Sequence, residues 1–170
     1  KSEKVKKIFA ATRKDANLFS FEETSSLILE FKPNLIINAA AKVGGIYANN
    51  SQRTSFITEN LKINLNIIES LKNYSDIGLI NLGSSCIYPL GAKNPIREEY
   101  FMTGPLEPTN SPYALAKISA IEMGRALHLD YGNRVINLMP TNLYGPNDFF
   151  HEEFSHVIPG MMLKCIIPNC

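Results

Sequence analysis

The heptapeptide Ser-Pro-Tyr-Ala-Leu-Ala-Lys at positions 111–117 decides the fold prediction, because it reads as the start of a helix with a phenol and an ammonium on one face. Ser111 is a suitable N-cap, and Pro112 suits the first helical turn, where a missing N–H group costs nothing. Four residues of helix advance about 6 Å and return nearly to the same azimuth, so Lys117 lies one turn beyond Tyr113. A nearby ammonium lowers the pKa of a phenol, which can then give a proton to a developing alkoxide. The pair is suited to carbonyl reduction.

Chance also produces this spacing, because a tyrosine four residues before a lysine is a weak pattern. The pair gains value only if a parallel α/β sheet, a serine at a strand end and a cofactor site fall where a reductase needs them.

Composition predicts a globular chain with one core. Of the 170 residues, 45% are hydrophobic and 19% are charged, which is too apolar for disorder. A net charge of +1 without a long basic run gives no footprint for nucleic acid or a membrane surface. No apolar run approaches the roughly 20 residues of a membrane span, so we expect a cytoplasmic protein. Three cysteines without metal-ligand spacing (Cys86, Cys165 and Cys170) indicate reduced thiols and no metal site.

Strand and helix patterns alternate along the chain. Strands are predicted at four apolar runs, namely Lys6–Thr12, Leu35–Ala40, Ile77–Leu82 and Arg134–Met139. The second run is continuous, as expected of a strand covered on both faces. Helices are predicted from the Ser20/Glu23 capping box to about Phe31, from about Arg53 to Tyr74, from Tyr113 to Gly132, and from His156 to about Cys165. This order favours one Rossmann-like domain over residues 1–170, a doubly wound parallel sheet with helices on both faces.

Polar residues follow several of these strands at the edge where such sheets bind ligands. Arg13 follows the first strand, and a cation there accommodates the 2′-phosphate of NADP, although an ordinary solvated arginine explains it equally simply. Ser84 and Cys86 follow the third strand and can face a substrate, but a free cysteine is more often a small buried hydrophobe. The connection from Leu90 to Asn110 is long enough to be functional.

Several runs together resemble one group of enzymes. They are Ala39–Ile46, Ser84–Pro89, Leu106–Asn110, Tyr113–Lys117, Met139–Pro146 and Ser155–Pro159. These runs are similar to those of the GDP-L-fucose synthases, epimerase-reductases of the extended short-chain dehydrogenase/reductase family. The resemblance implies a substrate, GDP-4-keto-6-deoxy-D-mannose, that is epimerised at C3 and C5 and then reduced at C4 with NADPH.

The same resemblance implies roles for individual residues. Cys86 and His156 act in the epimerisations, Tyr113 donates the proton in reduction, Lys117 assists it, and Ser84 donates a hydrogen bond to the C4 oxygen. The cofactor contacts it implies are Arg13, Asn17, Leu18, Leu82, Gly83, Ser84, Ser85, Lys117, Pro140, Thr141, Asn142 and Leu143. The substrate contacts are His156 and Lys164, and a homodimer is expected.

Family members also have a first strand with a glycine-rich turn and a C-terminal substrate-binding part, and these 170 residues contain neither. We therefore expect a domain truncated at both ends that is inactive by itself. Two alternatives stay open. One is another nucleotide-sugar epimerase or dehydratase of the same fold, although the dehydratases carry an acidic pair where Ser85 and Cys86 stand. The other is an inactive fragment or binding subunit.

Overall fold

Three runs of aliphatic residues form the parallel sheet at the centre of the computed structural model, which describes residues 5–151 and 155–166. The strands are β1 (Leu35–Asn38), β2 (Gly78–Leu82) and β3 (Val135–Leu138), in the spatial order β1-β2-β3. In this register Asn38 lies opposite Asn81, which in turn lies opposite Asn137. The parallel α/β sheet predicted from the sequence is confirmed.

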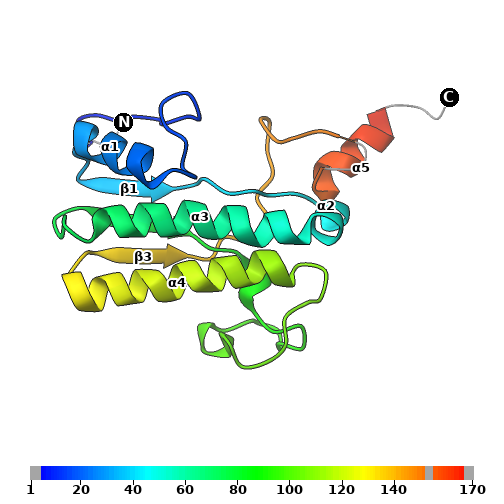
Figure 1. Cartoon of the computed structure of the whole chain (residues 1–170). Coiled ribbons are helices and arrows are strands. Elements are labelled where there is room, and N and C mark those ends of the chain that lie inside the picture. The colour runs from blue at the N-terminus through cyan, green and yellow to red at the C-terminus, as the bar shows by residue number, and fades with distance from the viewer. Residues whose placement is uncertain (1–4, 152–154, 167–170) are drawn as a thin grey trace.

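Within the described residues, five α-helices connect and flank these strands (Figure 1). They are α1 (Phe21–Phe31), α2 (Ile46–Ser51), α3 (Arg53–Leu71), α4 (Ser111–Tyr131) and α5 (Val157–Ile166), with short 3₁₀ turns at Ser85–Ile87 and Glu98–Tyr100. The Ser20 hydroxyl accepts the Glu23 N–H at 3.2 Å, as the capping box predicts. The Glu23 carboxylate, however, accepts the Asn17 N–H at 2.8 Å. It therefore fastens the preceding loop to the start of α1.

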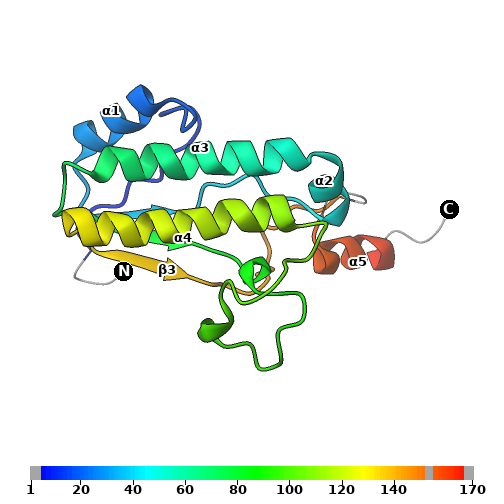
Figure 2. The same ribbon diagram turned by 60° about the horizontal axis from the view of Figure 1, so that its bottom comes forward.

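Helices α3 and α4 lie side by side over one face of the sheet, and α1 packs against α3 (Figure 2). Both crossovers, β1 to β2 and β2 to β3, advance across the sheet in the same direction. A right-handed crossover that advances in one direction always uses the same face. The other face is open in the described chain: Leu35, Ile37, Ile136 and Leu138 are 46–61% exposed. Helices are thus found on one face, and β1 is not covered on both faces as its apolar run predicted.

Residues 5–12 do not form the predicted first strand. A strand requires a hydrogen-bonding neighbour, and none of the three strands in the described residues pairs with this segment. Side chains hold the segment instead. The Phe9 ring stacks on the Phe31 ring with 4.8 Å between their centroids, and the Lys7 ammonium lies 4.9 Å from the centroid of the Phe31 ring. The described part of the chain therefore has three strands where four were predicted.

Buried asparagines link the three strands. Asn38 donates to Asn81 at 3.3 Å and to Asn64 of α3 at 2.9 Å, and Asn81 donates to Asn137 at 3.3 Å. Asn38, Asn64 and Asn81 are at most 5% exposed. Because a buried amide without a partner is costly, the ladder favours the one register in which all three strand positions face each other.

Truncating the middle member of this ladder tests its contribution. Asn81→Ala should lower the free energy of unfolding by about 1–3 kcal/mol, because it removes one partner from the buried Asn38 and one from the half-buried Asn137. Urea unfolding followed by circular dichroism measures the loss. Asn73→Ala, at an exposed loop position, is the matched control and should change little. Equal midpoints for the two variants would contradict a stabilising ladder.

Candidate active site

A cavity of about 780 Å³ lies at the carboxyl ends of the strands. The cavity is lined by the loop after β1 with the start of α2, Phe56 of α3, the turn after β2, the start of α4, and residues within 140–148 and 155–164. Among the predicted site residues it brings together Gly83, Ser84, Cys86, Tyr113, Pro140, Thr141, Asn142, Leu143, His156 and Lys164. Four proposed catalytic side chains therefore share one cavity.

Tyr113 sits in the first turn of α4, and its ring meets Phe56 of α3 edge-on, with 6.4 Å between ring centroids. Phe56 is 1% exposed, so it is a fixed support. Burial, together with the charge of Cys86, raises the pKa of Tyr113 to about 12, and a hydrogen bond with Ser84 only partly opposes this. The expectation of a lowered pKa is wrong for this structure, because desolvation outweighs any effect of Lys117. Tyr113 is a neutral phenol at pH 7.

Lys117 is a buried cation, 4% exposed, one turn beyond Tyr113. Its ammonium donates to the Leu82 carbonyl at 2.7 Å and lies 5.7 Å from the centre of the Tyr113 ring. Burial lowers the pKa of Lys117. Lys117 and Leu82 do not line the cavity. The lysine thus fastens α4 to the end of β2 behind the tyrosine.

The turn after β2 presents Ser84 and Cys86. The Ser84 hydroxyl accepts the Cys86 N–H at 3.3 Å and caps the 3₁₀ turn that begins at Ser85. Cys86 is a half-buried free thiol on the cavity wall, so the interpretation as a core residue is not supported. A Cβ at Gly83 would lie 2.4 Å from the sulfur of Met139 and 3.1 Å from the Leu138 carbonyl oxygen, so a larger residue here would displace the Met139 side chain.

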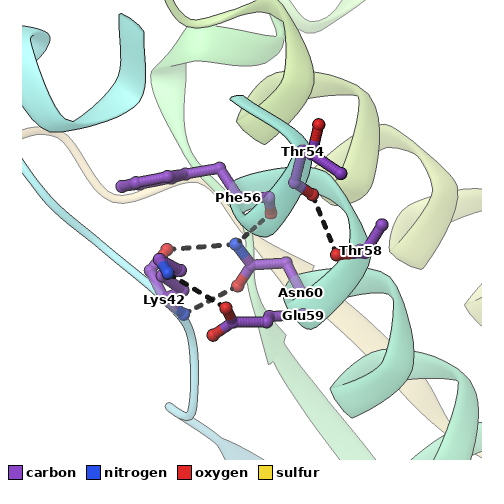
Figure 3. A network of polar contacts seen from close by, with 6 residues as sticks. All are labelled: Lys42, Thr54, Phe56, Thr58, Glu59 and Asn60. Atoms are coloured by element: carbon purple, nitrogen blue, oxygen red, sulfur yellow. Dashed lines mark hydrogen bonds and ion pairs between the residues drawn. The ribbon is translucent and has the colours of Figure 1, made fainter. Parts of the chain in front are cut away.

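The loop after β1 is held by α3 (Figure 3). The Asn60 side chain accepts the Lys42 N–H at 2.9 Å and donates to the Lys42 carbonyl at 3.0 Å and to Phe56 at 2.7 Å. The Lys42 ammonium pairs with Glu59 at 3.0 Å and lies 5.6 Å from the Phe56 ring centroid. This places the following residues, from Val43 on, along the cavity wall.

The sequence analysis predicted a helix here but named none of its residues for the site, so it missed Asn60. The available signal was polar residues at positions 60 and 64, four apart, on the stripe that also carries Phe56 and Ile67.

Asn49 is another wall residue that sequence reasoning missed. Its amide nitrogen donates to the carbonyls of Gly44 and Gly45, at 2.7 and 3.1 Å, which fixes the orientation of the amide. Its oxygen is buried and has no hydrogen-bond partner in the described residues. Since buried acceptors are normally satisfied, this oxygen is suited to a donor from a bound molecule or water.

The far wall comes from α5. His156 precedes the helix, and its carbonyl accepts the Gly160 N–H at 3.0 Å, so it occupies the N-cap position. Lys164, two turns further, also lines the cavity. Both side chains are exposed. The helix predicted from about His156 to Cys165 is confirmed.

Four predicted cofactor residues besides Leu82 and Lys117 lie outside the cavity lining: Arg13, Asn17, Leu18 and Ser85. Arg13 is exposed in a turn closed by the Asp15 N–H and the Thr12 carbonyl. The Leu18 carbonyl accepts from Asn66 of α3 at 2.8 Å. Their contact with a cofactor stays a prediction.

Residues 5–151 and 155–166 contain no group of three or more His, Cys, Asp or Glu side chains placed to hold a metal ion. Over the same residues, no helix is both long and apolar enough to cross a membrane.

Comparison of the sequence with known proteins assigns the chain to a family. The sequence pattern of the NAD dependent epimerase/dehydratase family matches residues 1–166. The chain belongs to this family. A GDP-L-fucose synthase of Sinorhizobium fredii is 47% identical over 157 residues, covering 92% of this chain and 50% of that protein.

Two solved structures of the family superpose closely. The NADP-bound GDP-L-fucose synthetase of Naegleria fowleri is 32% identical with a TM-score of 0.82, covering 92% of this chain and 48% of the other. A GDP-D-glycero-L-gluco-heptose synthase of Campylobacter jejuni, solved in the presence of NADPH, is 34% identical with a TM-score of 0.84, covering 91% and 45%. The chain thus spans about half the length of the relatives it matches.

The raised pKa of Tyr113 predicts how its ring titrates. The ring should not ionise until the pH approaches about 12. A phenol whose pKa is raised in the folded state above about 10 adds stability below that pH and loses the contribution as pH rises through 12. NMR of ring-labelled tyrosine, assigned by its absence in Tyr113→Phe, follows this titration. A midpoint at or below 10 would contradict the assigned burial.

Proposed function

We propose that this chain is the part of an NADPH-dependent epimerase-reductase that carries its catalytic side chains, and that the enzyme converts GDP-4-keto-6-deoxy-D-mannose to GDP-L-fucose. The main support for this proposal is that four side chains suited to the chemistry line one cavity at the carboxyl ends of the strands, namely Ser84, Cys86, Tyr113 and His156. The similarity to GDP-L-fucose synthases over nine tenths of the chain supports the choice of substrate.

Ser84 and Tyr113 serve both reactions through one substrate oxygen. A 4-keto group acidifies the C–H bonds on either side of it, so removal of a C3 or C5 proton puts negative charge on the C4 oxygen. Reduction at C4 puts charge on the same atom. Two hydroxyl donors held at this oxygen therefore stabilise the enolate and the alkoxide alike.

The protonation state of Tyr113 suits the second reaction. With its pKa raised to about 12, the phenol is protonated at neutral pH and can donate to the alkoxide that forms at C4. Lys117, buried behind it, stabilises the phenolate left after proton transfer.

Cys86 and His156 suit the proton transfers at carbon. They reach the cavity from the turn after β2 and from the start of α5, so they come from different walls. Inversion at a carbon requires removal of a proton on one face and delivery on the other, which two groups on separate walls provide. We assign Cys86 as base and His156 as acid.

The residues around the cavity fit a nicotinamide cofactor. Gly83 and the turn from Pro140 to Leu143 line the cavity at two adjacent strand ends, and Asn49 offers an unpaired acceptor. NADPH, when bound, supplies the hydride for C4. By the family resemblance we also expect Lys164 to contact the nucleotide sugar and the enzyme to be a homodimer.

A second candidate is a reductase that acts on a different GDP-sugar. The likeness to the Campylobacter jejuni heptose synthase favours it. The thiol at Cys86 favours epimerisation in addition to reduction, because a C4 reductase alone has no carbon acid to deprotonate.

Two variants should separate the reactions in a catalytically active protein that contains this chain. Cys86→Ser should suppress exchange of substrate C–H for solvent deuterium, because a serine hydroxyl keeps its proton near neutral pH whereas a thiol can lose its proton and act as a thiolate base. Reduction of a keto sugar should survive in part. Tyr113→Phe should leave exchange measurable and lower reduction by a factor on the order of 10².

NMR detection of deuterium beside NADPH consumption reads both steps in one sample. Deuterium exchange at the wild-type rate in Cys86→Ser would show that Cys86 is not the base. Equal losses of exchange and reduction in Tyr113→Phe would contradict the assignment of Tyr113 as the proton donor of the reduction step.

Cofactor preference tests Arg13 separately. Arg13→Ala should weaken binding of NADPH far more than binding of NADH, because only NADPH carries the 2′-phosphate that the guanidinium accommodates. Fluorescence titration of the active protein with both cofactors measures this. Lys14→Ala, a neighbouring exposed cation, is the control. Similar losses for the two cofactors would rule out the assignment.

A further inference from the structure

The start of α4 is held from outside the helix. Asn110, its N-cap residue, makes no side-chain cap hydrogen bond. Instead the Glu107 carboxylate accepts the N–H groups of Thr109 and Asn110 at 3.1 and 2.9 Å and the Thr109 hydroxyl at 2.5 Å. These hydrogen bonds lower the pKa of Glu107, and the bond from the Thr109 hydroxyl has the largest effect. The loop before the helix is therefore ordered by one carboxylate.

Arg53, the first residue of α3, holds the same segment from the neighbouring helix. One terminal nitrogen of its guanidinium donates to the Pro108 carbonyl at 2.8 Å and to the Thr109 carbonyl at 3.5 Å. The other donates to the Ser111 hydroxyl at 3.1 Å. Glu107 therefore accepts hydrogen bonds from the N–H groups of this segment, while Arg53 donates hydrogen bonds to its carbonyl groups.

These contacts join parts that are distant in sequence. Arg53 and Ser111 are 58 positions apart, and Ser111 stands two residues before Tyr113. Phe56, one turn further along α3, supports the Tyr113 ring itself. The first turn of α3 thus contacts the segment just before Tyr113 through Arg53 and the Tyr113 ring through Phe56.

We propose that Arg53 is a positioning residue for Tyr113: together with Glu107 it fixes the segment from Pro108 to Ser111, and so sets where the phenol stands in the cavity. The catalytic part of this inference rests on the proposed function, in which Tyr113 protonates the C4 oxygen. Donor and acceptor in such a transfer must lie within hydrogen-bonding distance, so a small displacement of the helix start slows reduction.

Arginine suits this place better than lysine. A guanidinium presents several N–H donors in a fixed fork, which reach two or three acceptors at once, whereas a lysine ammonium acts as a point charge on a flexible stem. Arg53 is exposed, so water competes for these contacts and their effect is moderate.

The kinetic test uses Arg53→Ala and Arg53→Lys in a catalytically active protein that contains this chain. Arg53→Ala should lower kcat of reduction about 3–10-fold with little change in the substrate KM, and Arg53→Lys should recover less than half of the loss. Deuterium exchange through Cys86 should fall less than reduction does, because Cys86 and Ser84 stand on the turn after β2, and Ser84 still donates to the C4 oxygen when Tyr113 is displaced. Arg125→Ala is the matched control: Arg125 is an exposed arginine of α4 whose guanidinium contacts Glu122.

A structural readout separates this inference from the proposed function. In Arg53→Ala the Asn110 amide should exchange faster with solvent and the NMR signal of the Tyr113 ring should shift, while Arg125→Ala leaves both unchanged. If the ring signal moves but kcat does not change, Arg53 is not a positioning residue for reduction, although its contacts with residues 108–111 order the start of α4. An unmoved ring signal in Arg53→Ala would overturn the structural part of the proposal, and equal loss of reduction and exchange would overturn its selectivity for reduction. The catalytic role of Tyr113 is tested separately by Tyr113→Phe.

Discussion

The hydrogen bonds among Asn38, Asn81 and Asn137 are the constraint on which the site depends. Each strand contributes one amide at the level where the sheet meets the cavity, and Asn64 ties the row to α3. A slip of one residue in any strand would bury these amides without partners and turn their neighbours to the wrong face. Because Gly83, Cys86 and the turn from Pro140 follow directly, the ladder aligns the strand ends that carry the cavity wall.

Helix α3 extends this alignment to the remaining walls. Its apolar side packs on the sheet through Ile63, Ile67 and Ile68, while its first two turns contact the loop after β1 and the start of α4. Although α3 supplies only Phe56 to the cavity lining, it sets the relative position of two walls. The proposed catalytic side chains and the helix that positions two of the cavity walls therefore belong to different elements.

Local signals in the sequence predicted the parts whose causes are local. The end of α4 at Gly132, which has φ 79°, and the proline in its first turn follow from capping rules, whereas the N-cap is Asn110 and not the predicted Ser111, which is the first residue of the helix. The missing strand at residues 5–12 was not predictable in this way, because strand formation depends on a neighbour elsewhere in the chain. The direction of the Tyr113 pKa was missed for a similar reason: spacing gives the nearness of Lys117 but not the burial of the phenol.

The burial shared by Tyr113 and Lys117 also decides which of them is the stronger acid. In water an ammonium of this kind holds its proton slightly more firmly than a phenol does. Here the pKa of Tyr113 rises to about 12 and that of Lys117 falls, so their order is reversed. As base is added, the lysine is the first of the two to become uncharged, and the pair passes through a neutral state before it becomes an anion.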